Sequence, residues 1–293
     1  PRELYLASDG LKHGRTDDPL NGATITEIHD AHLDLLHRFS GENTGTANIS
    51  NWNQLNSDKD WNIRYWKNKP VDLQGELERF QYEGGFIFRY KHDGSPQYIH
   101  IKDTYTSSNY TLTKHDINNV KVTPSSLSNI LSAMDINYQK HPAENRYLTA
   151  VSSSNSTTRI NYNFQEKENI SEVSLHAYVS PTIPTAPATS PNDDFYSYYN
   201  NISGSPKLII TGDIVNSKFY NIEVGDVVNF EDRPFEFFNT SDVADDLFWD
   251  SSSEDWEDTD DLWSTGTGDD KYFMITSLTR KIGILSFTAR EIA

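Results

Sequence analysis

The chain contains no cysteine among its 293 residues, and only 25 basic residues stand against 43 acidic ones, a formal net charge of −18. Without cysteine there are no disulfides, thiolate metal sites or cysteine nucleophiles. The small number of Lys and Arg residues argues against binding to nucleic acid or to anionic lipid. We find no apolar run of 18 residues and no basic–apolar leader, so we expect no membrane span and no signal peptide. Pro1 opens the sequence without Met, which fits a processed product or a piece of a longer polypeptide.

Much of the negative charge lies in one segment. Residues 241–270 hold ten Asp and two Glu and no basic residue, so without those twelve charges the remainder carries −6. This acidic insertion, taken as 231–270, also carries the aromatic residues Phe248, Trp249, Trp256 and Trp263. Three interpretations of this segment stay open. It could be a solvated loop, or a segment whose aromatic side chains contact a partner. It could also be a calcium site, although the usual spacing of a calcium-binding loop is absent. We take those four aromatic residues as candidate partner contacts.

Helical signals dominate the N-terminal part, residues 1–83. Thr24 and Glu27 form a capping box before an apolar stripe that ends at Gly41, and residues 72–81 form a shorter candidate helix. Trp52 to Pro70 is predicted to be an irregular link.

From residue 84 the pattern alternates, which indicates an α+β part over 84–180. Phe86–Tyr90 and Gln97–Ile101 flank a hairpin signal, and Leu127–Lys140 is predicted to be one long strand. Tyr147–Val151 and Arg159–Asn163 are predicted to be a second strand pair, and Glu166–Val179 a helix.

A connector at 181–194 contains four Pro and is expected to be stiff and extended. The C-terminal part, 195–293, is expected to form a β-barrel-like domain that carries the acidic insertion. After an aromatic helix near 195–199, its strands are predicted at Lys207–Thr211, Phe219–Ile222, Asp226–Phe230, Tyr272–Leu278 and Ile284–Arg290. The expected fold class is therefore α+β, mainly β, with β-barrel or sandwich-like modules and a few short helices.

No residue set predicts a catalytic, metal or cofactor site. His29, His32 and His37 share the first helix but do not converge on one face, so we interpret them as packed or surface residues. There is no serine nucleophile elbow and no phosphate-binding glycine loop. Gly225 and Asp226 predict a structural turn before a strand, because Gly permits the turn and Asp can bind its amides.

Taken in order, several segments resemble the tail hub or tail-tip proteins of tailed bacteriophages. The segments are GGFIFRYKHDGSPQYIHIKD, LTKHDINNVKV and LSNILSAMDINYQKHPA, followed by the turn at 224–228 and the closing strands at 273–292. The resemblance implies a non-enzymatic subunit of the virion that closes the tail tube and takes part in host attachment and genome passage. It also implies a homotrimer or ring that contacts the tube, distal tail, fibre or spike, and that assembles in the host cytoplasm.

Two other functions stay open. Trp61, Tyr65 and Trp66 on a β-rich scaffold would suit a carbohydrate-binding module of a tail fibre or cell-surface protein. A polysaccharide or peptidoglycan hydrolase would need a carboxylate pair, and the order of the acidic residues singles none out.

Overall fold

Two compact units make up the chain in a computed structural model. The structure describes residues 22–42, 45–66, 72–102, 105, 107–141, 144, 146–165, 168–179, 194–230, 271–281 and 283–292. Unit 1 comprises Pro1–Asp103 and Ser126–Pro206, and unit 2 comprises Thr104–Ser125 and Lys207–Ala293. None of the described helices is long and apolar enough to span a membrane.

This grouping differs from the predicted consecutive parts 1–83, 84–180 and 195–293. The stretch Thr104–Ser125 joins the C-terminal strands because its strand β5 (Ile117–Pro124) pairs antiparallel with β10 (Leu208–Ile214). Pairing between distant segments is not visible in local sequence patterns. The predicted connector at 181–194 lies outside the described residues except for Asp194, which caps a helix.

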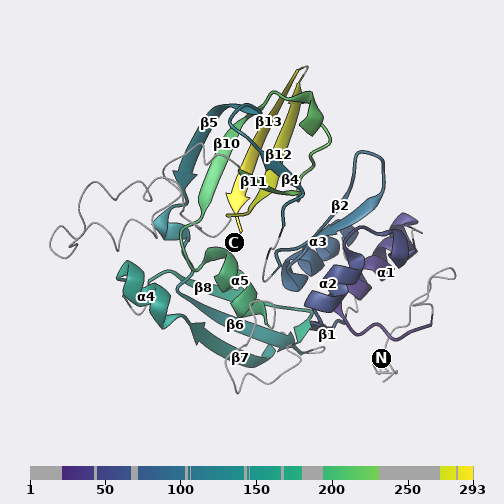
Figure 1. The fold of residues 1–293 in the computed structure, drawn as a ribbon. Helices are drawn as coiled ribbons and strands as arrows, with labels where there is room; N and C mark the ends of the chain where they lie inside the picture. The colour runs from purple at the N-terminus through teal and green to yellow at the C-terminus, as the bar shows by residue number, and fades with distance from the viewer. Residues whose placement is uncertain are drawn as a thin grey trace. The chain divides into compact units, whose positions relative to one another are not determined.

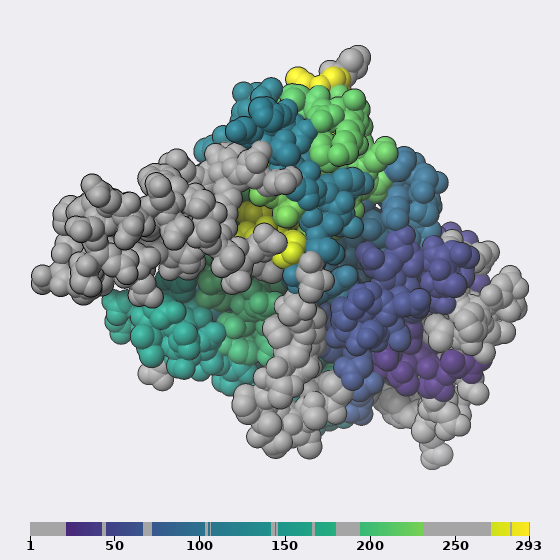
Figure 2. Space-filling view, viewed as in Figure 1, coloured from purple at the N-terminus to yellow at the C-terminus, as the bar shows by residue number. Residues whose placement is uncertain are grey.

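Unit 1 contains the helices and three small sheets (Figure 1). The helices are α1 (Ile28–Ser40), α2 (Trp52–Asp58), α3 (Leu73–Gly84), α4 (Ser156–Tyr162) and α5 (Phe195–Ser203), with the 3₁₀ turns η1 (Thr46–Asn48) and η2 (Leu127–Asn129). α1 and α2 form one continuous part of the surface (Figure 2).

The sheets of unit 1 are short. β1 (Asn62–Ile63) pairs with β9 (Tyr178–Val179), and β2 (Ile87–Tyr90) pairs with β3 (Pro96–Ile99) in the predicted hairpin. The third sheet has the order β7-β6-β8, from β7 (Tyr147–Ser154), β6 (Ala133–Lys140) and β8 (Ile170–Ser174). Its inner face meets a core of aromatic residues from α2, α5 and β9, which includes Trp52, Phe195 and Tyr178.

The first helix begins later than predicted. Its N-cap is Glu27, whose side chain makes no capping bond, and Thr24 precedes the helix. The reason is that Glu27 bridges Asn62 of β1, so this residue is held in an extended conformation. The predicted stop is confirmed, because Gly41 adopts the left-handed conformation at φ 77°.

Four further predictions for unit 1 are wrong or wrong in part. The strand predicted over Leu127–Lys140 is shorter, because residues 127–129 form η2 and β6 begins at Ala133. The segment 52–70 contains α2 and β1 and supplies the core residues Trp52 and Trp61. Residues 156–162 form α4 instead of a strand, because Asn155 caps a helix by accepting from the Thr158 N–H. Residues 170–179 form β8 and β9 instead of a helix, because β8 pairs parallel with β6.

Unit 2 is a six-stranded sheet with the order β4-β11-β12-β13-β10-β5, which can be followed across Figure 1. Its other strands are β4 (Tyr110–Leu112), β11 (Val227–Phe230), β12 (Phe273–Lys281) and β13 (Ile284–Glu291). β4 and β5 are the two end strands of this sheet, and only residues 113–116 connect them. The sheet curls into a half-barrel, which allows so short a connection between its ends.

The half-barrel confirms the predicted fold class of α+β, mainly β, with barrel-like strands in the C-terminal region. The predicted strand at 219–222 is wrong, because Phe219 is the last residue of the 3₁₀ turn η3 (Ser217–Phe219), which Asn216 caps, and a turn follows at residues 220–221. The core of this unit is aliphatic and aromatic, and its centre includes Ile210, Ile275 and Phe287.

Candidate functional site

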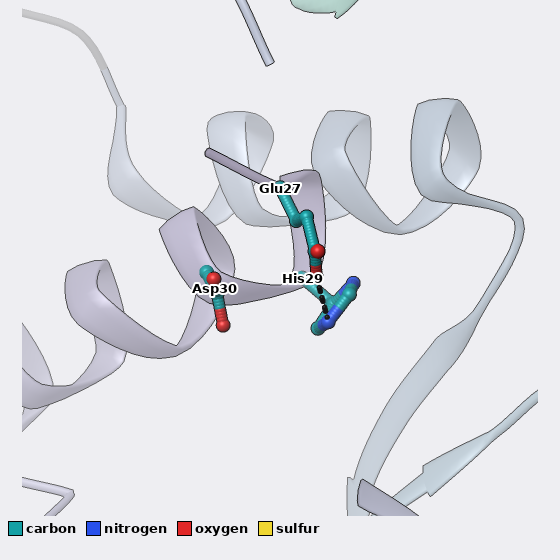
Figure 3. Close-up of side chains that lie close together, drawn as sticks. All are labelled: Glu27, His29 and Asp30. Atoms are coloured by element: carbon teal, nitrogen blue, oxygen red, sulfur yellow. Dashed lines mark ion pairs between the residues drawn. The ribbon is translucent and has the colours of Figure 1, made fainter. Parts of the chain in front are cut away.

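The start of α1 brings together three potential metal ligands, Glu27, His29 and Asp30, whose ligand atoms lie within 4.8 Å of one another (Figure 3). Glu27 and His29 point toward each other, and Nε2 of His29 lies 2.8 Å from Oε2 of Glu27. The same ring nitrogen lies 3.1 Å from Oδ1 of Asn56 on α2. The cluster therefore joins the beginning of α1 to a neighbouring helix.

The electrostatics of this cluster favour an ion pair over a metal centre. Burial lowers the pKa of His29, but the bond to Glu27, the charges of Asp30 and Glu27, and the bond to Asn56 together raise that pKa above its usual value. A protonated imidazole donates from both nitrogens and offers no lone pair to a metal. His29 therefore acts as a packed, charged residue that holds α1 in place.

His32 lies one turn further along α1 among aromatic rings. It is fully buried, its Nδ1 lies 2.9 Å from the Tyr98 hydroxyl, and the ring of Phe86 packs edge-on against it. Burial, followed by the charge of His29, lowers the pKa of His32 to about 3. A neutral His32 in this position packs the core, as the sequence led us to expect.

Glu83 is a buried carboxylate that the sequence analysis did not single out. It accepts hydrogen bonds from three consecutive backbone amides, those of His176, Ala177 and Tyr178, at 2.8, 2.6 and 2.9 Å. Burial outweighs these bonds and raises the pKa of Glu83. The carboxylate anchors the segment before β9 to α3.

A signal for Glu83 was present in the sequence. Glu76, Phe80 and Glu83 are spaced four and three residues apart, which places two acids on the apolar face of one helix. Glu76 is also buried, and its carboxylate accepts from the Tyr65 hydroxyl at 2.7 Å and from Arg79. Acidic residues are almost never fully buried without a partner, so an acid on the apolar face of a helix predicts a hydrogen-bonding or charged partner in the core.

A buried lysine occupies the centre of unit 1. Lys59 is 1% exposed, and its Nζ lies 3.9 Å from the ring centroid of Trp61 and 3.1 Å from that of Tyr198. Aromatic faces attract a cation strongly when water is excluded. Lys59 therefore ties α2 and β1 to α5 within the core.

The aromatic residues that were expected to bind a carbohydrate are mostly in the core. Trp61 is 1% exposed, and Tyr65 packs on Phe80. Trp66 is 43% exposed. A carbohydrate site built on Trp61 is wrong, because its ring is enclosed by Tyr178, Phe195 and Tyr198.

Gly225 and Asp226 lie in a turn that leads into β11. Gly225 has φ 89°, and its N–H donates to the carbonyl of Ile275 at 2.8 Å. The carboxylate of Asp226 accepts from the Glu223 N–H at 2.8 Å. Both residues join the turn to the sheet, since the Ile275 N–H also donates to the Asp226 carbonyl at 2.9 Å.

The candidate partner contacts Phe248, Trp249, Trp256 and Trp263 lie outside the described residues, as does the whole acidic insertion 231–270. Their contact with a partner stays a prediction.

The described surface offers two features that suit assembly. The half-barrel has an end strand on each side, β4 and β5, and an end strand presents backbone groups that can pair with another chain. Phe39 and Ile160 are the two most exposed large apolar side chains among the described residues, at 68% and 79%.

Comparison with known proteins gives similarity of fold. No protein-family model matches the chain, and no curated protein matches its sequence. A chain of the virion of native gene transfer agent particle aligns over 91% of this chain and 47% of its own length, with a TM-score of 0.53 and 10% identity. This chain therefore spans about half the length of that virion chain.

Two tail proteins align at lower scores. The tail protein from Neisseria meningitidis MC58 aligns over 91% of this chain and 66% of its own, with a TM-score of 0.46 and 9% identity. A prophage tail protein from Listeria monocytogenes EGD-e aligns over 78% and 55%, with a TM-score of 0.37 and 10% identity. At the level of the fold, the resemblance drawn from the sequence is confirmed by the gene transfer agent chain: this protein has a fold that occurs in a virion particle.

Proposed function

We propose that this protein is a structural subunit of a phage-type tail. The observation that carries the proposal is the fold shared with the gene transfer agent virion over 91% of the chain. The buried ionisable groups support it, because His29, Glu83 and Lys59 all bind partners within the fold. Charged groups that bind partners within the fold in this way have a structural role, which suits a structural subunit.

Within the tail, we place the subunit at the hub or tip. There it would close the tube, contact the tube, distal tail, fibre or spike proteins, and open for genome passage. The net charge of −18 suits a conduit, because an acidic wall repels phosphate and does not retain DNA. Host attachment and assembly in the host cytoplasm belong to the same proposal.

This role requires self-association, with a homotrimer or a larger ring as the expected state. End strands and exposed apolar side chains provide the contact surface. Ile160, on α4, is the most exposed large apolar side chain among the residues described. We expect this side chain to lie in a contact between subunits.

Mass photometry of the purified chain over a range of concentrations tests the proposal. The expected result is a species whose mass is a multiple of the 33.4 kDa subunit. Ile160→Asp should shift the population to monomer, whereas Asn161→Asp on the same short helix should leave it assembled. A monomer at every concentration, or an oligomer equally insensitive to both substitutions, counts against the proposed contact.

A further inference from the structure

A pocket of about 300 Å³ opens on unit 1 between α3, α5 and the beginning of β8. Tyr82 of α3 and Tyr199 of α5 line one side, and Asn129 at the end of η2 and Asn169 before β8 line another. The volume lies at the lower end of the range for small-molecule sites. This pocket is separate from the cluster at Glu27 and His29 and from the half-barrel.

Its lining contains no charged residue, although 23% of the chain is charged. The floor is apolar, since Ile130 and Met134 are each 3% exposed. Leu131 and Ile170 add further apolar surface, and five neutral polar residues complete the lining: Ser128, Asn129, Asn169, Ser171 and Ser203. A lining of this kind excludes ions and favours a ligand with both an apolar face and hydroxyl groups.

The two tyrosine rings are held in place before any ligand arrives. The Tyr199 hydroxyl donates to the Tyr82 backbone carbonyl at 2.8 Å, and the ring centroids lie 5.4 Å apart. Tyr82 is nevertheless 46% exposed, so part of its surface is open to solvent. Burial raises the pKa of both phenols, which keeps them neutral near pH 7.

The polar wall is fixed as well. Nδ2 of Asn169 donates to the Leu127 carbonyl at 2.9 Å, and the Ser132 N–H donates to the Asn169 carbonyl at 3.1 Å. Asn169 has φ 53°, a left-handed conformation that Asn tolerates better than most residues. On the opposite side, the Leu131 N–H donates to the Ser203 carbonyl at 2.7 Å. Fixed walls reduce the ordering cost of binding.

We propose that this pocket binds one ring of a neutral saccharide. The C–H face of a pyranose is apolar and can pack against Tyr82, while its hydroxyls can bond to the amides and serine hydroxyls. An anionic sugar finds no cation in this lining, and a purely apolar side chain offers no hydrogen bonds to the amides and serine hydroxyls of the polar wall. The site differs from Trp61, Tyr65 and Trp66, on which the sequence placed carbohydrate binding.

Titration of the full chain by NMR tests the site. The probes are the methyl glycosides of glucose, galactose and N-acetylglucosamine, with glucuronate as the anionic comparison and indole as the apolar one. We expect at least one neutral glycoside to shift the side-chain amide signals of Asn129 and Asn169 in a saturable way. Glucuronate and indole should leave these signals in place.

Two variants with matched controls locate the binding. Tyr82→Ala removes the open ring and should weaken the affinity about tenfold, which corresponds to the loss of one aromatic contact. Tyr90→Ala is its control, because Tyr90 is 49% exposed and lies outside the pocket. Asn129→Ala should also weaken binding, whereas Asn53→Ala, at another exposed asparagine, should not.

Several results would overturn the proposal. They are the absence of a saturable shift with every neutral glycoside, equal binding by Tyr82→Ala and wild type, or tighter binding of indole than of any sugar. The last result would make the pocket an anchor site for an apolar side chain of a partner. The proposal does not depend on self-association, so a monomeric chain can still bind the sugar.

Discussion

The two units place their polar residues very differently. Among the residues that the structure describes, fourteen polar or charged ones are buried, and twelve of these belong to unit 1, including His29, Lys59 and Glu83. Unit 2 has only Asp116 and Glu223 among them, and its core is aliphatic and aromatic. Asp116 binds the Thr113 N–H and Asn216 beside a turn. Unit 1 thus depends on particular charge partners, while unit 2 depends on strand pairing and apolar burial.

The largest effect should come from removing one buried charge. Glu83→Ala leaves three backbone N–H groups without their acceptor and should lower the free energy of unfolding by about 3 kcal/mol. Chemical denaturation measures this change. Glu78→Ala, at an exposed acid on the same helix, should stay within about 0.5 kcal/mol of wild type. Equal effects of the two substitutions would show that the anchor contributes little.

A second comparison separates backbone strain from crowding. Gly85 and Gly41 both have positive φ, at 62° and 77°. A Cβ at Gly85 would lie 2.8 Å from Nζ of Lys59, whereas a Cβ at Gly41 meets nothing within 4 Å. Gly41→Ala should therefore cost about 1 kcal/mol.

Gly85→Ala should cost about 1 to 3 kcal/mol more than Gly41→Ala, because the aromatic core around Lys59 must move. Thermal denaturation of the two variants provides the measurement. Similar melting temperatures for Gly85→Ala and Gly41→Ala would mean that the side chains around Gly85 move aside at little cost in free energy.

Acid should weaken unit 1 before unit 2. Burial lowers the pKa of His32 from 6.5 to about 3. Between these two pH values the unfolded chain binds a proton at His32 and the folded chain does not. The free energy of unfolding therefore has its full value above pH 6.5, and the uptake of this proton lowers it by about 2 kcal/mol at pH 5. Hydrogen exchange should show faster opening of unit 1 amides at pH 5.

The variant His32→Phe should flatten that dependence on acid, and His115→Phe, at an exposed histidine of unit 2, should not. If hydrogen exchange became faster at pH 5 to the same extent in both units, the proposed difference in their sensitivity to acid would be wrong.

The smallest effect should come from His29, and its sign is opposite. Its pKa is raised, so the ion pair with Glu27 is fully present below pH 6.5 and is lost as the pH rises through the folded-state pKa. The loss should be about 0.5 kcal/mol, because Glu27 is partly exposed. In His29→Gln, the free energy of unfolding should no longer decline as the pH rises above 6.5.

Sequence patterns predicted the elements that local signals define. The stop at Gly41, the hairpin of β2 and β3, and the strands β12 and β13 follow from glycine and alternation. The errors arose where distant partners decide the structure. β8 is a strand because it pairs with β6, and Glu27 is extended because it bridges Asn62.

The candidate sites were less predictable. Asn129, Asn169 and Tyr82 lie far apart in sequence, and only the packing of α3, η2 and β8 brings them to one pocket. The spacing of Glu76 and Glu83 did carry a readable signal, since acids on an apolar face require partners.

Electron-microscopic class averages of the purified 293-residue chain test the central claim most directly. A structural tail subunit should appear as closed rings, with three-fold symmetry as the expected arrangement. Images that show only separate particles of single-chain size, at concentrations where neighbouring subunits could meet, would contradict the proposed role.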